Sequence, residues 1–373
     1  MALLLILFVI NGPEETNLTG VKSEDYNRSI SWERVVNGEY QKSIKAWLNS
    51  HFYGYSDVIR IHNQIEYSVV GDATGEFVQG KSGYLFSGLQ SNLYVMGEKG
   101  NPNSVTEYDA YAQSVASLQE ELNSKNKDFL YILTPSKTEI MEEYLPWNYK
   151  LLANMFADSP NTAHAMLIDA FDKDGVNYYD ATQDIKDLND LGNVVVYHKG
   201  AHHWTLSAAV YEIDKIFTEK NKNFSHVELP KIYVDSYREG VYSQDNDIID
   251  AQNLFFSKKD NSFIIPDIKY EQSDSSVFLF GTSYGREIMD ALYTDIGNRA
   301  FDVFSFAQYF TEITDCDDNG VCKTAFSIDD NPSELGIMER INNSDLIIVE
   351  QNSTFGIRET HKKFVDFVVE GLR

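Results

Sequence analysis

The sequence predicts an α/β protein with a doubly wound, mostly parallel β-sheet. Short apolar runs recur along the chain, and stretches with the apolar spacing of an amphipathic helix separate them. Because these runs are apolar on both faces, they fit strands of a parallel sheet that helices cover on both sides. With 373 residues, of which 43% are hydrophobic, the chain can form one large domain with additional segments.

Six apolar runs are the predicted strands, and they cover residues 128–134, 176–179, 194–197, 276–280, 300–305 and 345–350. Helices are predicted at 105–124, at 162–173, from about Thr205, and directly after the strand 276–280. The stretch of about 221–275 is rich in Tyr, Asp, Asn and Lys, and we expect an irregular or antiparallel insertion there. Ligands of doubly wound sheets bind beyond the carboxyl ends of the strands, so residues that follow these runs are candidates for a functional site.

The chain begins with an apolar run at residues 2–10, followed by a polar stretch. This run is too short to span a bilayer, which takes about 20 residues, and it lacks the basic flank of a complete signal peptide. We expect residues 1–24 to be a leader or anchor remnant with a linker, and the protein to be periplasmic or otherwise extracytoplasmic. A buried N-terminal strand or helix is the alternative. We expect residues 25–78 to form a helical segment that precedes the main domain, and residues 79–373 to form that domain.

Cys316 and Cys322 are the two cysteines of the chain. The residues between them include Asn319-Gly320, which favours a disulfide that closes a tight hairpin in an oxidising compartment. The same stretch imitates the start of an EF-hand loop, but Phe326 stands where that loop needs a bidentate glutamate. We therefore expect a disulfide and no calcium site.

The charge balance is strongly acidic, with 57 acidic against 31 basic side chains and a net charge of -26. Such a field repels nucleic acid and other polyanions. Nucleic acid is therefore excluded as a partner, and a polyanionic substrate is disfavoured.

Ser283 lies in Phe280-Gly-Thr-Ser-Tyr-Gly285, between a predicted buried strand and a helix. A serine at such a sharp turn projects outward, and N–H groups of the following helix terminus lie nearby and can stabilise an oxyanion. The alternative is an ordinary serine that caps a helix.

A second candidate is the pair His202 and His203, in a loop that precedes the helix from Thr205. Adjacent histidines point in different directions, so at most one faces a given partner. The sequence offers no further ligands at metal spacing, and we expect neither a metal nor another cofactor. Ser283 and one of these histidines could form a nucleophile–base pair.

Four motifs then carry a family resemblance. They are Gly80-Lys-Ser-Gly-Tyr-Leu-Phe86, Leu133-Thr-Pro-Ser-Lys137 with Glu143-Tyr-Leu-Pro146, His202-His-Trp204 and Gly281-Thr-Ser-Tyr284. In this order, over about residues 79–352, they resemble the SGNH-hydrolase-like polysaccharide O-acetyltransferases of the alginate type, including the related Asp-His-His-Trp proteins.

The resemblance implies an SGNH-like fold with permuted motif order, because the histidine precedes the serine. It implies Ser283 as nucleophile and His203 as general base. The implied activity is that of an envelope O-acetyltransferase, which moves acetyl through a serine ester onto a glycan hydroxyl. A membrane acyltransferase partner would supply the acetyl group. A carbohydrate acetylesterase, in which water accepts the acetyl group, is the enzymatic alternative.

The sequence departs from the family at the triad acid, which falls on Ala201. Loss of this acid in well-studied triads costs roughly 10⁴-fold in kcat. Three explanations stay open. In the first, a backbone carbonyl or another carboxylate orients His203, with Asp180 and Glu350 as candidates. In the second, the chain is a catalytically silent glycan-binding member of the family. In the third, the acid at position 201 was exchanged for alanine to trap substrate.

Four further residues are candidates for substrate binding. Asn352 is either a hydrogen-bond donor to the oxyanion or an ordinary loop asparagine. Trp204 either stacks on a sugar ring or packs against the start of its helix. Lys137 either contacts a ligand or has a structural, capping role. Tyr284, next to the serine, is the fourth. Given the acidic charge, we expect a neutral or weakly acidic exopolysaccharide, capsule or O-antigen glycan rather than a polyuronate.

Overall fold

The computed structural model describes residues 18–19, 29–101, 103–156, 159–242, 244–257, 263–271, 273–295, 298–317, 321–327 and 330–373. The predicted leader at 1–24, including the apolar run, lies outside these ranges apart from Leu18 and Thr19. In the part of the chain that the structure describes, no helix is both long enough and apolar enough to span a bilayer.

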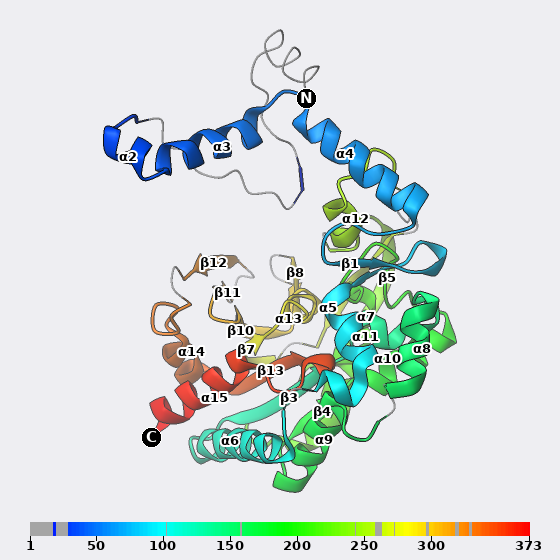
Figure 1. Cartoon of the computed structure of the whole chain (residues 1–373). Helices are drawn as coiled ribbons and strands as arrows, with labels where there is room; N and C mark the ends of the chain where they lie inside the picture. Colours follow the sequence, from blue (N-terminus) through cyan, green and yellow to red (C-terminus); the bar gives the residue numbers. More distant parts are fainter. Residues whose placement is uncertain are drawn as a thin grey trace.

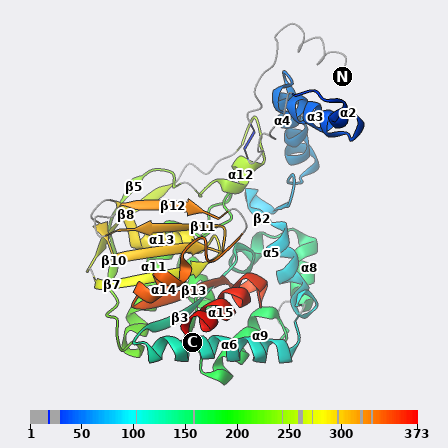
Figure 2. The ribbon, with the colours of Figure 1, turned by 90° about the vertical axis from the view of Figure 1, so that its left-hand side faces the viewer.

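The body is a seven-stranded sheet with helices on both faces (Figures 1 and 2). The strand order is β12-β11-β10-β7-β13-β3-β4. From β10 to β4 all neighbours are parallel, whereas β11 and β12 extend the sheet as an antiparallel hairpin. The strands are β3 (Asp128–Thr134), β4 (Tyr178–Asp180), β7 (Ser273–Gly281), β10 (Phe301–Gln308), β11 (Glu312–Cys316), β12 (Cys322–Phe326) and β13 (Leu346–Asn352). The predicted α/β class with a mostly parallel sheet is therefore confirmed.

Alternate residues of the central strands point to opposite faces and enter two apolar layers. In β3, Leu130 and Ile132 face one layer, and Phe129, Tyr131 and Leu133 face the other. All five are nearly or fully buried, and each large aliphatic side chain so buried stabilises the fold by about 1.5–3 kcal/mol.

Each layer is completed by its own helices. The first layer holds α5 (Gly88–Met96), α7 (Lys137–Ile140), α8 (Trp147–Phe156), α10 (Thr182–Leu191), α11 (Leu206–Lys220) and α13 (Gly285–Leu292). The second holds α6 (Val105–Ser124), α9 (Ala163–Asp174), α14 (Ile337–Asn343) and α15 (Glu359–Leu372).

The carboxyl ends of three strands lie side by side, and the edge that they form is the end of the sheet at which the parallel strands finish. The parallel register places Val349 of β13 beside Phe280 of β7, and Asn352 beside Thr134 of β3. The residues that follow β7, β13 and β3 are therefore neighbours in space, which is where the sequence predicts the functional site.

The remaining elements lie outside the central sheet. The segment 221–275 contains an antiparallel pair of strands and one short helix, β5 (Ile232–Glu239), β6 (Ile264–Tyr270) and α12 (Asp247–Ala251). Two further strand pairs are β1 (Phe77–Gln79) with β2 (Leu85–Ser87), and β8 (Tyr293–Asp295) with β9 (Asn298–Arg299). Single turns of 3₁₀-helix are η2 (Lys81–Gly83), η3 (Gly97–Gly100), η4 (Glu142–Tyr144), η5 (Asn221–Asn223) and η6 (Ser353–Phe355).

The predicted helical segment before the main domain contains α2 (Trp32–Val36), α3 (Glu39–His51) and α4 (Tyr55–Ile65), followed by the π-helical turn η1 (Glu66–Val70). Figure 1 shows α2 and α3 standing away from the sheet. Asn63 of α4 joins the segment to the body by donating a hydrogen bond of 2.8 Å to the carbonyl of Gln252. The predicted domain boundary at residue 79 falls at the end of β1, which pairs with β2.

One predicted strand is wrong. Residues 194–197 form no strand but an irregular loop, in which Val196 and Tyr197 are buried in the first apolar layer. The Tyr197 hydroxyl donates to the carbonyl of Pro135, and the N–H of Thr205 donates to the carbonyl of Val196. The apolar character of this run therefore serves packing beside the sheet rather than strand pairing.

The predicted disulfide is present between Cys316 and Cys322. The two residues are cross-strand partners in the β11–β12 pair, so the disulfide ties the antiparallel hairpin at the edge of the sheet.

Candidate active site

Ser283 lies in the turn between β7 and α13, at the edge where the parallel strands end. The buried carboxylate of Glu350 fixes this turn: its Oε2 accepts hydrogen bonds of 2.8 Å from both the N–H and the hydroxyl of Thr282. Its Oε1 accepts from the Thr134 hydroxyl at 2.6 Å. A Cβ atom at Gly281 would lie only 2.8 Å from Glu350 Oε2, so a glycine is needed there.

Lys137, which follows β3, fixes the loop that carries His202 and His203, called here the histidine loop (residues 198–204). Its Nζ donates to the carbonyls of His198, Lys199 and Ala201 at 2.7, 2.8 and 2.7 Å. An ammonium group has three donors, so all are used, and the side chain is only 1% exposed. Burial lowers the pKa of Lys137 well below its usual value. Of the two alternatives for Lys137, these contacts support the structural one, and no donor of its ammonium group is left for a ligand.

A chain of hydrogen bonds joins Ser283, His203 and Asp247. The distance from Ser283 Oγ to His203 Nε2 is 2.8 Å, and that from His203 Nδ1 to Asp247 Oδ2 is 3.1 Å. Asp247 Oδ1 accepts a hydrogen bond of 2.7 Å from the N–H of His202. With the Nδ1 proton donated to Asp247, Nε2 of neutral His203 is free to accept the serine proton.

The electrostatics of the site keep Asp247 negatively charged. Burial acts to raise the pKa of Asp247, but its hydrogen bond to His203 and the two neighbouring histidines outweigh this, and the pKa lies below its usual value. Burial and the nearby His203 lower the pKa of His202 to about 3, so His202 is neutral. Burial, together with Asp290 and Asp247, raises the pKa of Glu287 in α13 well above its usual value, and this acid is neutral too.

The short helix that carries Asp247 is anchored on two sides. The N–H of Ile249 donates to the carbonyl of Gly200 at 3.0 Å, and a Cβ atom at Gly200 would lie 2.6 Å from the Ile249 side chain. On the other side, the buried Gln252 accepts hydrogen bonds from the N–H and the hydroxyl of Thr74, at 2.7 and 3.0 Å. These contacts fix the carboxylate relative to the histidine loop.

Asn352 is the last residue of β13, and its side-chain amide is buried. It is 1% exposed, and its Oδ1 accepts from the N–H of Thr354 at 3.3 Å. Its buried Nδ2 has no hydrogen-bond partner among the described residues. Val349 pairs with Phe280 in the parallel register, so Asn352 at the end of β13 and the Ser283 turn after β7 lie at the same end of the sheet. A buried amide without a partner is costly, which points to a ligand or a reaction intermediate as its acceptor.

The acid of the site is a residue that sequence reasoning missed. The family position falls on Ala201, which is buried and contributes its carbonyl to Lys137. The candidates Asp180 and Glu350 are both engaged elsewhere, Asp180 with His164 and Glu350 with the serine turn. Asp247 lies 44 residues beyond His203, in the irregular segment, and its one local signal is that it begins a short apolar helical stretch.

Trp204 and Tyr284 also differ from the expectation that they contact substrate. Each is 1% exposed. Trp204 packs in the first apolar layer. The Tyr284 hydroxyl donates to the carbonyl of His202 at 2.9 Å, and its ring centre lies 4.9 Å from that of His203. Both side chains therefore support the histidine loop and offer no face to a sugar.

A second charged network lies at the same edge of the sheet. The ring of His164 is 3.4 Å from Glu139 Oε1 through Nδ1 and 3.1 Å from Asp180 Oδ2 through Nε2. Glu139 Oε2 accepts from the Ser353 hydroxyl at 2.9 Å, next to Asn352. Burial acts to lower the pKa of His164, but hydrogen bonds to the two carboxylates outweigh it and raise the pKa to about 10. His164 is therefore a protonated link that holds the turn after β13.

No protein-family model and no curated protein sequence matches the chain. Several solved structures are similar to it, among them these three. The O-acetyltransferase domain of Pseudomonas putida AlgJ is 11% identical, with a TM-score of 0.49 over 79% of this chain and 98% of that one. Pseudomonas aeruginosa AlgX is 14% identical, with a TM-score of 0.44 over 74% of this chain and 62% of AlgX. A DHHW family protein from Eubacterium siraeum is 14% identical, with a TM-score of 0.38 over 71% of this chain and 88% of that protein.

Structures of the kinds that the motifs resemble, an O-acetyltransferase domain and a DHHW protein, are thus among those similar to this chain. With identities of 11–14% and TM-scores below 0.5, the likeness by itself assigns no activity to this chain.

The His164 network predicts a pH-dependent contribution to stability. Because the folded pKa of about 10 lies above the ordinary 6.5, this contribution is complete below about pH 6.5 and is lost as the pH rises through 10. We expect the His164 ring to stay protonated at pH 8.5 in an NMR titration. The network should contribute on the order of 5 kcal/mol at pH 6.

The control is the exposed His226. Substituting it with glutamine should leave the pH dependence of the free energy of unfolding unchanged, whereas His164→Gln should reduce the loss of stability between pH 6.5 and 10. An NMR pKa of His164 near 6.5 would contradict the account of this network.

Proposed function

We propose that this chain is a serine acyl-transfer enzyme that moves an acetyl group through an ester on Ser283 to a glycan hydroxyl. The observation that carries the proposal is the continuous hydrogen-bonded path from Asp247 through His203 to Ser283, with distances of 3.1 and 2.8 Å. A nucleophile, a base within reach of it and an acid that orients the base are the parts that acyl transfer needs.

In the first half-reaction, Ser283 Oγ attacks the carbonyl carbon of the acetyl donor while His203 Nε2 takes the serine proton. The negative oxygen of the tetrahedral intermediate accepts hydrogen bonds from the N–H of Ser283 and from Asn352 Nδ2. When the bond to the donor breaks, the leaving oxygen takes the proton from Nε2. Acetyl-serine and neutral His203 remain.

In the second half-reaction, a glycan hydroxyl replaces the donor. His203 Nε2 removes its proton as the oxygen attacks the acetyl-serine carbonyl, and the same two donors face the oxyanion. Collapse of this intermediate breaks the serine ester, and Ser283 Oγ recovers its proton from His203. Asp247 stabilises the imidazolium in both halves and holds the ring tautomer.

The substrate that we propose is a neutral or weakly acidic glycan of the cell envelope. The net charge of -26 opposes the approach of a polyuronate, whose carboxylates would meet a repulsive field. Strong binding of polymannuronate oligomers with weak binding of neutral ones would contradict this substrate class.

The family resemblance of the motifs supports two further parts of the proposal. A membrane acyltransferase partner would deliver the acetyl group, and the order His203 before Ser283 would be the permuted SGNH arrangement. We also propose a periplasmic or extracytoplasmic location. The disulfide supports it, since disulfides persist in oxidising compartments.

A carbohydrate acetylesterase is the second candidate, because water can attack the same acetyl-serine. A catalytically silent glycan-binding protein is disfavoured. Ala201 was the reason to consider it, and Asp247 supplies the carboxylate that Ala201 lacks.

Acetyl transfer through Ser283 is tested with p-nitrophenyl acetate. We expect mass spectrometry of the acid-quenched reaction to find a 42-Da adduct on the peptide that contains Ser283, and neutral oligosaccharides to increase turnover by accepting the acetyl group. The Ser283→Ala variant should show neither. Release of all acetate to water at every oligosaccharide concentration would favour the esterase, and absence of both adduct and turnover would contradict the proposal.

The oxyanion role of Asn352 is tested with Asn352→Asp. The aspartate keeps an oxygen for the N–H of Thr354 but loses the amide donor, so the fold should be retained. We expect kcat for p-nitrophenyl acetate to fall by about 10²–10³-fold with little change in KM, since such donors act mainly on the transition state. Full activity of a folded Asn352→Asp protein would exclude this role.

A further inference from the structure

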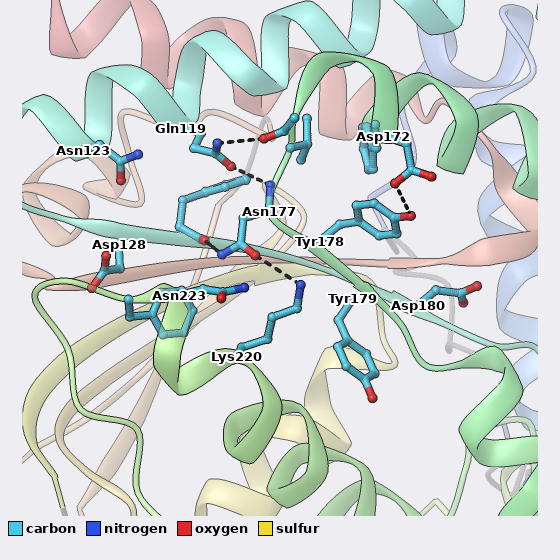
Figure 3. A pocket seen from close by; sticks show the side chains of 15 residues that line it. Gln119, Asn123, Asp128, Asp172, Asn177, Tyr178, Tyr179, Asp180, Lys220 and Asn223 are labelled. Carbon is cyan, nitrogen blue, oxygen red and sulfur yellow. Dashed lines mark hydrogen bonds between the residues drawn. The ribbon is translucent and has the colours of Figure 1, made fainter.

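A second cavity, of about 700 Å³, opens beside β4 at the outer edge of the sheet. In Figure 3, Gln119 and Asn123 line it on one side, and Lys220 and Asn223 line it on the other. It contains none of the residues that form the Ser283 site. Its walls come from α6, β4 and the end of α11 with η5.

Side-chain amides occupy part of the backbone at this cavity. β4 covers only part of β3, and the Asn177 side chain caps the rest by donating to the carbonyl of Phe129 at 2.8 Å. Gln119 Oε1 holds the N–H of Asn177 at 2.7 Å. A peptide strand added beside this part of β3 would need the backbone groups that these amides occupy, which favours a ligand recognised through side chains.

The side chains that face the cavity suit a sugar. Tyr178 and Phe224 present partly exposed aromatic rings, and Asn123 and Asn223 have exposed amides that make no hydrogen bond with other described residues. Rings that pack against an apolar face, beside amides that both donate and accept, match the apolar face and the hydroxyl rim of a pyranose.

Lys220 adds a cation that is not neutralised. Its Nζ donates to Asn177 Oδ1 at 3.2 Å, and it has no carboxylate partner among the described residues. The ammonium lies 5.8 Å from the centre of the Tyr179 ring. Since an ammonium has three donors, two remain for hydroxyl or carbonyl oxygens of a ligand.

The carboxylates at the cavity are already engaged. Asp128 accepts from the N–H groups of Ser225, His226 and Val227, and Asp172 accepts from the Tyr178 hydroxyl. Lys220 is the one cation among the described residues that line the cavity, and beside several carboxylates it does not attract a polyanion. The cavity therefore favours neutral sugar units.

The cavity extends toward the end of the sheet where the parallel strands finish and Ser283 lies. Its lining extends from Asp128, where β3 begins, to Asp180, where β4 ends. A seven-residue strand spans roughly 20 Å, and β4 lies three strands from β7, which is roughly 14 Å across the sheet. A polymer that leaves the edge at Asp180 therefore needs only a few more units to reach Ser283.

We propose that this cavity is a distal subsite that binds neutral sugar units of the acceptor polysaccharide whose reacting unit lies at Ser283. The inference rests on the proposed acetyl transfer to a glycan. It predicts that long acceptors bind better than short ones, and that the cavity changes acceptor affinity without changing the chemistry at the serine.

The test is calorimetric binding of neutral oligosaccharides to the full chain carrying Ser283→Ala, which prevents turnover. The probes are the disaccharides and hexasaccharides of the cello-, manno-, xylo- and malto- series. We expect at least one hexasaccharide to bind more tightly than its disaccharide. Lys220→Met should weaken that hexasaccharide about tenfold and leave the disaccharide unchanged, because one charge-assisted hydrogen bond is lost.

Lys222→Met is the matched control, because Lys222 is an exposed lysine of the neighbouring turn that does not line the cavity. It should bind like the parent, while Asn223→Ala should weaken the hexasaccharide as Lys220→Met does. In the chain with Ser283 intact, Lys220→Met should hydrolyse p-nitrophenyl acetate at the parent rate.

Equal hexasaccharide binding by Lys220→Met and its parent, or binding of no hexasaccharide at all, would overturn the subsite. Failure of the acetyl-transfer proposal is seen separately, as loss of the acetyl-serine adduct in the chain with Ser283 intact.

Discussion

The hydrogen bond between Asp247 and His203 is the interaction on which the proposed chemistry depends. In that proposal it fixes the proton on Nδ1, leaves Nε2 to accept the proton of Ser283, and stabilises the imidazolium that forms. Without it, the serine and histidine would remain within reach of each other, but the base would lack its orientation. The surrounding structure holds the three segments that carry Ser283, His203 and Asp247 within hydrogen-bond distance of one another.

Each of the three segments has its own support. The parallel sheet delivers the serine turn, which the buried Glu350 holds. Lys137 fixes the histidine loop through three carbonyls. The acid arrives on α12, which is packed on that loop and tied by Gln252 to the segment before β1. Because the strand ends of β7, β13 and β3 meet at one edge, the amide of Asn352 joins the site from a fourth direction.

The sequence predicted the parts of this arrangement that depend on local pattern. Apolar runs such as 128–134 and 276–280 indicate buried parallel strands, and Ser283 and His203 follow from motifs at strand and helix ends. Asp247 could not be found in this way, since its role depends on a tertiary contact made from an irregular segment. The same limit applies to Trp204 and Lys137, whose burial depends on packing that no local pattern encodes.

The most direct test of the central claim is kcat for p-nitrophenyl acetate in Asp247→Asn, compared with Ala201→Asp. Asparagine keeps an oxygen for the N–H of His202 but no longer accepts the Nδ1 proton as a carboxylate does. The account predicts a loss of roughly 10³–10⁴-fold in Asp247→Asn and no gain in Ala201→Asp, because Asp247 already accepts from Nδ1 of His203. Unchanged activity in Asp247→Asn, or increased activity in Ala201→Asp, would contradict the assignment of Asp247 as the acid.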